Sequence, residues 1–205
     1  MAPVFWQQAT QHLSACDPVI QRLIQRHGDA RLEGSGDAFS TLVRAIVGQQ
    51  ISVKAAASVW QRMVVALPEM TPQALELVDA DVLRACGLSA RKAEFLRDLS
   101  SHFLQGGLKA LVWREMDDED LIAALTQVKG IGRWTAEMFL IFHLHRPDVL
   151  PLADVGLQRA VSIHYNASQP VSKNRISAIA DNWRPWRSVA TWYLWRSLDP
   201  IPVIY

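Results

Sequence analysis

The stretch Val128-Lys-Gly-Ile-Gly-Arg-Trp-Thr-Ala136 is the most specific part of this sequence, because it joins two segments of helical patterning by a very short turn. Gly130 and Gly132, one residue apart, allow positive φ and let a backbone come close to a large partner. Val128 and Ile131 are the apolar positions expected to pack inward and fix the turn. The stretch therefore predicts a tight hairpin between two helices.

The second helix of this hairpin, which starts near Arg133, is expected to present unpaired N–H groups in its first turn. The helix dipole favours an anion such as phosphate at that point. Lys129 and Arg133 add positive charge nearby. The hairpin therefore predicts a phosphate-binding turn. The alternative interpretation is an ordinary corner between two helices, whose glycines serve tight packing only.

Helix signals continue along most of the chain. Thr71-Pro72 places an N-cap residue before a proline at the first helical position, and Gly87 stands where a helix C′ residue is expected. Asp117 opens another helix with an acidic first turn. Ser89 caps a segment whose apolar face has helical spacing, formed by Ala93, Leu96, Leu99 and Phe103. Later helices are expected at about 133–145, 155–165, 173–182 and 187–198, so the fold class is all-α.

The segment from Phe39 to Leu67 is apolar but is interrupted at Gly48-Gln-Gln-Ile-Ser52. Ser52 is expected to cap the helix that follows. The buried face of that helix is expected to comprise Ala56, Trp60 and Val64. The adjacent glutamines Gln49 and Gln50 have two interpretations. They are either solvated linker residues or long polar side chains directed at a ligand.

The chain has 205 residues, of which 50% are hydrophobic and 20% charged, an ordinary globular composition. No apolar run approaches the roughly 18 residues of a membrane span, and the N-terminal segment lacks the pattern of a signal peptide. Cys16 and Cys86 are the only cysteines, which excludes a four-cysteine iron–sulfur cluster or structural zinc site. The segment 69–125 is acidic and the segment 126–205 is basic. This distribution indicates either an anionic partner that contacts one part of the surface or a merely uneven surface charge.

Four segments together resemble the helix-hairpin-helix (HhH-GPD) superfamily of DNA glycosylases. The segment 128–136 resembles the hairpin of that superfamily, and Leu150-Pro-Leu-Ala-Asp154-Val-Gly-Leu-Gln-Arg159 resembles its catalytic-aspartate segment. Arg44-Ala-Ile-Val-Gly-Gln-Gln-Ile-Ser52 and the tryptophan-rich segment 183–196 resemble the 3-methyladenine DNA glycosylase II branch. The four segments cover about residues 39–198 in order.

The resemblance implies a monofunctional DNA glycosylase that hydrolyses the N-glycosidic bond of alkylated purines, mainly 3-methyladenine and 7-methylguanine, in base excision repair. Such a reaction needs a nucleotide flipped out of the stack, a pocket for its base, and a negative charge near the developing sugar cation. The resemblance assigns that charge to Asp154. The position of Asp154 before a helical run also predicts a helix N-cap, and the two roles are compatible.

The resemblance places Trp134, Met138 and Trp186 in the base pocket. Electron-rich indole faces attract the cationic ring of an alkylated purine. Met138 stands where some members have a tyrosine, so the pocket is expected to be softer and less able to donate a hydrogen bond. Four other tryptophans are expected to be packing residues, namely Trp60, Trp183, Trp192 and Trp195.

Trp134 also bears on the chemistry of the DNA strand. The bifunctional members of the superfamily carry a lysine at this place in the hairpin, and that lysine forms a Schiff base with the sugar. Lys129 lies instead at the hairpin tip, where it is expected to face phosphate. Without an amine at position 134, no cleavage of the strand by β-elimination is expected.

The expected partner is double-stranded DNA that contains damaged bases. Gln50 falls near the position that fills the gap left by the flipped base, and Gln49 is expected to support that loop. The other DNA-binding residues that the resemblance implies are Lys129, Gly130, Ile131, Gly132, Arg133 and Thr135. We expect a monomer without membrane association, located in the cytoplasm and associated with the nucleoid if the source is bacterial.

The resemblance implies no iron–sulfur cluster and no catalytic cofactor. It does imply a structural monovalent cation, Na⁺ or K⁺, held by the hairpin carbonyls of Thr126, Val128 and Ile131. The implied architecture is a single domain over residues 1–205, made of two helical lobes with a cleft between them. One lobe is expected at about 39–125, and the other is expected to combine 1–38 with 126–205.

Two other functions remain open at this point. A hairpin alone would serve a non-catalytic DNA-binding module that holds phosphates, whereas Asp154 and an aromatic pocket are needed only by an enzyme. The same fold could also act on another lesion, such as ethenoadenine, hypoxanthine or uracil. Base release from a panel of damaged duplexes separates these functions.

Overall fold

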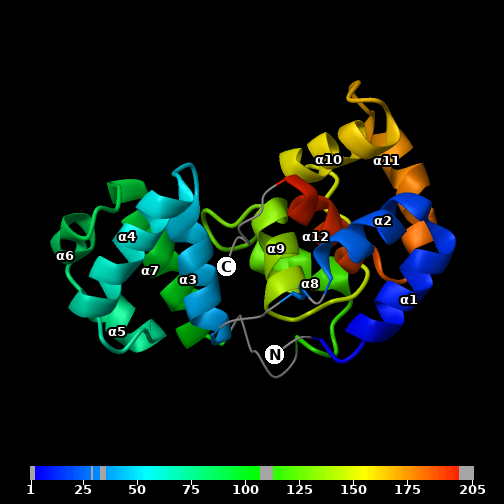
Figure 1. The fold of residues 1–205 in the computed structure, drawn as a ribbon. Coiled ribbons are helices and arrows are strands. Elements are labelled where there is room, and N and C mark those ends of the chain that lie inside the picture. Colours follow the sequence, from blue (N-terminus) through cyan, green and yellow to red (C-terminus); the bar gives the residue numbers. More distant parts are fainter. Residues whose placement is uncertain (1–2, 29, 33–35, 107–112, 199–205) are drawn as a thin grey trace. The chain divides into compact units, whose positions relative to one another are not determined.

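The computed structural model describes residues 3–28, 30–32, 36–106 and 113–198, and every regular element in these ranges is helical (Figure 1). The all-α class that the sequence predicts is therefore confirmed. Within the described ranges, no helix has both the length and the apolar character that crossing a membrane would require.

The helices form two compact units. The terminal unit contains the described residues up to Leu32 and those from Leu140 onward, and the central unit runs from Gly36 to Phe139. The boundary after Phe139 differs from the lobe boundary expected after about residue 125. The hairpin therefore belongs with the central unit, where it contacts α7 and Gln49, the residue directly after α3. The cleft expected between the lobes stays a prediction.

The central unit begins with helices whose first turns are capped by side chains. The Asp37 carboxylate accepts a hydrogen bond from the Ser40 N–H at 3.0 Å, and the Ser52 hydroxyl accepts one from the Ala55 N–H at 3.2 Å, as predicted for Ser52. The helices of this unit are α3 (Ala38–Gly48), α4 (Val53–Ala66), α5 (Pro72–Leu77), α6 (Ala80–Ala85), α7 (Ala90–Leu104), α8 (Asp118–Leu125) and α9 (Arg133–Phe142), the last of which ends in the terminal unit.

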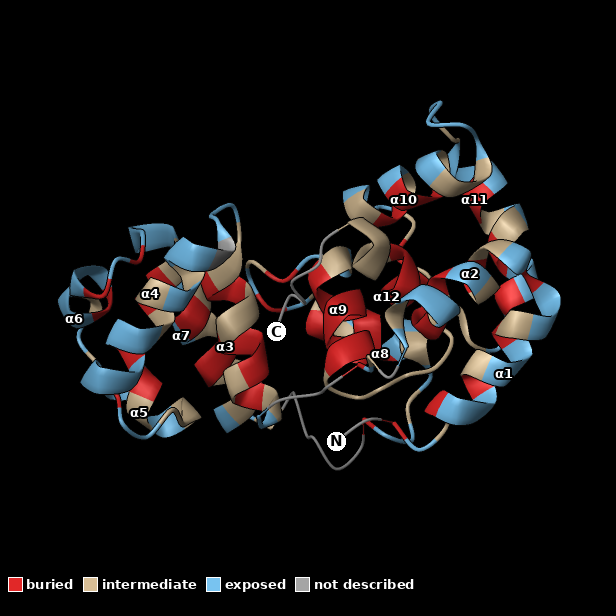
Figure 2. Ribbon diagram, in the orientation of Figure 1, coloured by how far each residue is buried: buried red, intermediate tan, exposed pale blue. Residues whose placement is uncertain are grey.

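Helix α7 lies at the core of the central unit, where it packs against α3, α5 and α6. The apolar face predicted for α7 is confirmed, since Leu96 and Leu99 are completely buried. Figure 2 shows the buried residues of α3 and α7. Edge-to-face ring contacts extend this core, with centroids 5.1 Å apart for Phe39 and Phe103 and 5.3 Å apart for Trp113 and Phe139.

The buried face predicted for α4 is wrong. Val59 and Met63 are buried, whereas Val64 is 42% exposed. Trp60 is half-buried at the surface, with the Arg44 guanidinium 4.6 Å from its ring centroid. The cation–π contact shows why an aromatic residue on this helix need not face the core.

The terminal unit is built around α12, which packs against α1, α2 and α10. Trp183 and Trp192 are buried, which confirms the packing role predicted for them. Trp6 closes this core by an edge contact with Trp192, at 5.1 Å between ring centroids. The elements of this unit are α1 (Trp6–Cys16), α2 (Pro18–His27), α10 (Val155–Tyr165), α11 (Lys173–Ala180), the 3₁₀ helix η1 (Asp181–Trp183) and α12 (Arg187–Leu198).

A buried aspartate, Asp17, joins three elements of the terminal unit. One of its oxygens, Oδ1, caps α2 by accepting from the N–H groups of Val19 and Ile20 at 2.8 and 3.1 Å. The other, Oδ2, accepts from the Tyr165 hydroxyl of α10 and the Trp183 indole of η1, both at 2.8 Å. Burial, and then the charge of Asp17, raise the pKa of Tyr165, so the phenol stays a donor.

Candidate active site

Asp154 immediately precedes α10 and is its N-cap. Its Oδ1 atom accepts a hydrogen bond from the Leu157 N–H at 2.6 Å, which confirms the capping geometry predicted from its position. The side chain is partly exposed, and its own N–H donates to the Pro151 carbonyl at 2.9 Å. The carboxylate is therefore held at a defined place on the surface of the terminal unit.

The loop that leads to Asp154 is fixed to the start of α12. The Ser188 hydroxyl donates to the Arg146 carbonyl at 2.6 Å and accepts from the Val149 N–H at 2.9 Å. The Arg187 guanidinium contacts the Asp148 carboxylate at 2.7 and 3.0 Å. A two-pronged arginine–carboxylate contact is geometrically demanding. The loop therefore has little freedom where it approaches Asp154.

Trp195 of α12 contacts the same carboxylate oxygen. Its indole Nε1–H donates to Asp154 Oδ1 at 2.7 Å, and its ring stacks on Phe142 with centroids 5.8 Å apart and 12° between the planes. The sequence predicts only a packing role for Trp195, so this contact was missed. The signal that could have found it is the indole N–H, which usually needs a partner when the ring is largely buried.

Gly156 leaves room for this contact. A Cβ atom at this position would lie 3.1 Å from Asp154 Oδ1 and 3.1 Å from Trp195 Cδ1. Both neighbours are held in place, one by a helix cap and the other by stacking. No prediction was made for Gly156 from the sequence, although a glycine in the first turn of a helix is unfavourable and therefore points to a local reason.

The hairpin has the packing that the sequence predicts. Val128 and Ile131 are 1% and 4% exposed, and the Ile131 N–H donates to the Val128 carbonyl at 3.1 Å to close the turn. Gly130 has a φ of 84°, and a Cβ atom there would overlap the Phe95 ring of α7. Gly130 is therefore required both for its backbone conformation and for the close approach of Phe95.

The positive side chains of the hairpin are engaged with carboxylates of the central unit. The ammonium of Lys129 lies 3.3 Å from the Glu94 carboxylate. The Arg133 guanidinium contacts Glu119 at 2.5 Å and Glu137 at 3.0 Å. The hydrogen bond to Glu119, and then the charges of Glu119 and Glu137, raise the pKa of Arg133. The DNA contacts expected of Lys129 and Arg133 stay predictions. Thr135 is 4% exposed, and its expected DNA contact also stays a prediction.

The two glutamines after α3 have different surroundings. The Gln49 side chain donates from Nε2 to the Gly130 carbonyl at 2.8 Å, so Gln49 connects its loop to the hairpin and is not a solvated linker residue. Gln50 is exposed and has a φ of 57°. Its expected place in the gap left by a flipped base stays a prediction.

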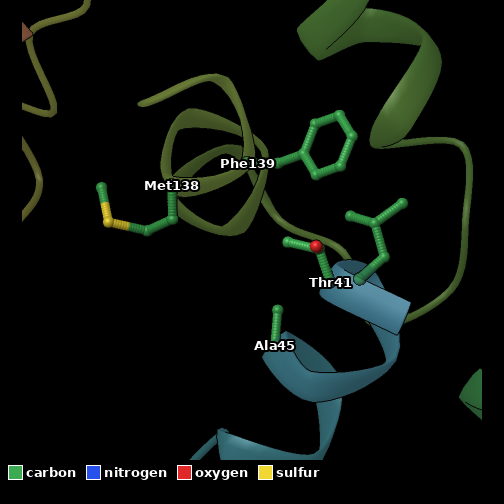
Figure 3. Close-up of a pocket in the computed structure, with 5 residues that line it drawn as sticks. Thr41, Ala45, Met138 and Phe139 are labelled. Atoms are coloured by element: carbon green, nitrogen blue, oxygen red, sulfur yellow. The ribbon is translucent and has the colours of Figure 1, made fainter. Parts of the chain in front are cut away.

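The three residues expected to form the base pocket lie in both units. Trp134 and Met138 belong to α9, whereas Trp186 precedes α12 and stacks on Phe5 with centroids 5.3 Å apart. Figure 3 shows Met138 and Phe139 beside a small apolar cavity, which is also lined by Thr41, Leu42 and Ala45 of α3. The cavity offers about the space of one water molecule, so it cannot itself hold a purine. The pocket stays a prediction.

The family of the chain follows from comparison with known proteins. The family profile described as "HhH-GPD superfamily base excision DNA repair protein" matches residues 43–185, which is more than half of the chain. The protein therefore belongs to the HhH-GPD superfamily of base excision DNA repair proteins, and the resemblance seen in the sequence is confirmed.

Within this superfamily, the chain is similar to several DNA-3-methyladenine glycosylases. The DNA-3-methyladenine glycosylase 1 of Schizosaccharomyces pombe is 33% identical over 197 residues, which cover 93% of this chain and 86% of the relative. A solved structure of the 3-methyladenine DNA glycosylase of that organism in complex with abasic DNA has a TM-score of 0.83 at 32% identity, over 93% of this chain and 96% of the other. The crystal structure of a DNA-3-methyladenine glycosidase from Bacillus halodurans has a TM-score of 0.84 at 34% identity, over 92% and 88%.

Proposed function

We propose that this protein is a monofunctional DNA glycosylase that hydrolyses the N-glycosidic bond of alkylated purines, with Asp154 as the catalytic carboxylate. The observation that carries the proposal is the double hydrogen bond at Asp154 Oδ1, from the Leu157 N–H and the Trp195 indole, in a chain whose relatives are named 3-methyladenine glycosylases. The two donors orient one carboxylate on a rigid helix start.

The chemistry follows from the charge of this carboxylate. As the bond between the sugar and the damaged base breaks, positive charge develops on the sugar ring, and a preorganised anion stabilises it. A carboxylate can also orient the attacking water or accept its proton. Because Leu157 and Trp195 both donate to Oδ1, they fix the side-chain torsion of Asp154 before the substrate arrives. Little reorganisation is then needed in the transition state.

Strand cleavage is not part of the proposed activity. It needs an amine that forms a Schiff base with the sugar, and Trp134 stands at the hairpin position that holds the lysine of the bifunctional members. The nearest hairpin amine in sequence, Lys129, lies at the tip beside Glu94. We therefore assign hydrolysis without lyase activity.

DNA glycosylases of this family need no cofactor. We further propose a monomer that grips double-stranded DNA at the hairpin, with a monovalent cation at the carbonyls of Thr126, Val128 and Ile131. The support for the cation is one contact: the Val128 carbonyl accepts the Ile131 N–H at 3.1 Å and keeps a second lone pair for an ion. Such an ion would rigidify the turn.

The proposed function is tested with a duplex methylated by an alkylating agent. We expect release of free 3-methyladenine and 7-methylguanine, with no strand scission before alkali treatment and no covalent product on borohydride addition. Borohydride trapping would contradict the monofunctional assignment. Duplex binding without release of any base would show a non-catalytic module. Release of only ethenoadenine, hypoxanthine or uracil from matched duplexes would move the specificity to another lesion.

The substitution Trp195→Phe is expected to slow base release by about 10- to 100-fold, because a hydrogen bond to a charged group contributes about 1.5–3 kcal/mol and the indole N–H is lost. Phe keeps an aromatic ring against Phe142, so the melting temperature is expected to change little. Single-turnover release from 7-methylguanine duplex measures the effect. Trp60→Phe, on α4 of the central unit, is the control, and an equal loss in both variants would show a nonspecific effect.

A further inference from the structure

Lys92 lies in the first turn of α7 and contacts the end of another helix. Its ammonium donates to the carbonyls of Val47 and Gln49, both at 2.7 Å. These carbonyls belong to the C-terminal end of α3, where helix carbonyls lack partners and the dipole favours a cation. Burial lowers the pKa of Lys92, as expected for an ammonium partly removed from water.

The loop that Lys92 holds contains Gln50. Gln49 is tied from both sides, since its carbonyl accepts from Lys92 and its amide donates to the Gly130 carbonyl of the hairpin. The next residue, Gln50, has a φ of 57°, a left-handed backbone conformation that is unfavourable for a non-glycine residue. Such a conformation persists only where neighbouring contacts enforce it. The contacts of Lys92 and Gln49 are those constraints.

The same face of α7 also holds the hairpin. Phe95 lies three positions after Lys92, and its ring packs against Gly130. Asp98 lies three positions after Phe95, and its carboxylate accepts a hydrogen bond from the Lys129 N–H at 2.8 Å. Residues spaced by three lie on one side of a helix. One face of α7 therefore holds two elements at once, the Gln50 loop through Lys92 and the hairpin through Phe95 and Asp98.

We propose that Lys92 is a positioning residue for Gln50. It sets the backbone from which Gln50 projects toward the gap left by a flipped nucleotide, while making no contact with DNA itself. The proposal rests on the proposed function, because only a base-flipping enzyme needs a side chain at that gap. A role confined to capping α3 would stabilise the fold but would not act through the Gln50 side chain.

A double-mutant cycle between Lys92 and Gln50 separates these roles. Lys92→Met removes the ammonium and keeps the apolar stem, Lys92→Arg keeps a cationic donor, and Gln50→Ala removes the side chain that is positioned. The two readouts are single-turnover release of 7-methylguanine and affinity for a duplex that holds an abasic site. Thermal melting of each variant shows how far the fold is affected.

We expect Lys92→Met to lower both the release rate and the duplex affinity about tenfold, within the usual range of coupling between contacting residues. Lys92→Arg is expected to restore most of the loss. In the Gln50→Ala background, Lys92→Met should cause almost no further loss, because the side chain it positions is already absent. The matched control is Arg97→Met, since Arg97 lies on the same helix and donates to the Val78 carbonyl at the end of α5, away from the loop.

Two outcomes overturn the proposal while leaving the proposed function intact. One is a loss from Lys92→Met that is as large in the Gln50→Ala background as in the wild type, which shows a general structural role. The other is no loss from Lys92→Met at all. If the wild type binds the abasic duplex but releases no base, the proposed function fails, and the cycle measured by affinity still decides the role of Lys92. A wild type that binds no duplex overturns both.

Discussion

Asp154→Asn is expected to lower the rate of base release by about 10³-fold, because preorganised electrostatic groups in a reaction site contribute about 10²–10³ in rate when removed singly. Asparagine has the same size, and its carbonyl oxygen can still accept from the Leu157 N–H and the Trp195 indole. Only the negative charge is lost. The measurement is single-turnover release of 7-methylguanine, with affinity for abasic duplex and the melting temperature recorded alongside.

Asp37→Asn is the matched control for this substitution. Asp37 is also a helix N-cap whose carboxylate accepts one backbone N–H, from Ser40 at 3.0 Å, but it belongs to α3 and is exposed. Asparagine and aspartate are about equally good N-caps, so neither variant should lose more than a few tenths of a kcal/mol in stability. Full base release by Asp154→Asn would show that another group supplies the charge, and the mechanism given above would be wrong.

Local signals explain why so much of the fold could be predicted from the sequence. Caps such as Ser52 and Ser89 act within three residues of their own position, and the α7 face is a periodic pattern within a single helix. The packing of a helix against the rest of the chain is not local in this way. On α4, more than one set of apolar residues could form the buried face, and the structure buries Val59 and Met63 but not Val64.

The same distinction between local and distant contacts applies to the candidate site. The N-cap role of Asp154 and the inward packing of Ile131 depend on neighbours in sequence, and both were predicted. The contact of Trp195 with Asp154 spans 41 positions, and that of Lys92 with Gln49 spans 43. No periodicity or spacing indicates which distant groups will meet. Contacts of this kind decide how a site is oriented, and they had to be seen in the structure.

Asp17→Ala is expected to destabilise the protein by about 4 kcal/mol. The change leaves the Tyr165 hydroxyl and the Trp183 indole N–H without their acceptor, and each buried unsatisfied group costs about 1–3 kcal/mol. It also removes the cap of α2, which is worth about 1 kcal/mol. Denaturant titration measures the free energy of unfolding. The melting temperature should fall by about 10 °C, since each kcal/mol shifts a chain of this size by about 2–4 °C.

The matched control is Asp79→Ala, because Asp79 is an exposed N-cap of α6 that accepts only the Asp81 N–H at 3.0 Å. Its loss should cost about 1 kcal/mol, and similar losses in the two variants would show that the buried network adds nothing beyond the cap.

The hydrogen bonds around Asp17 also predict a pH dependence of stability. The pKa of Tyr165 is raised in the folded protein, first by burial and then by the charge of Asp17. The wild type should therefore keep this contribution below about pH 10, where an unfolded tyrosine titrates, and lose it as the pH rises further. Tyr165→Phe should lower stability at neutral pH and remove that alkaline loss, whereas an unchanged alkaline loss would place its origin elsewhere.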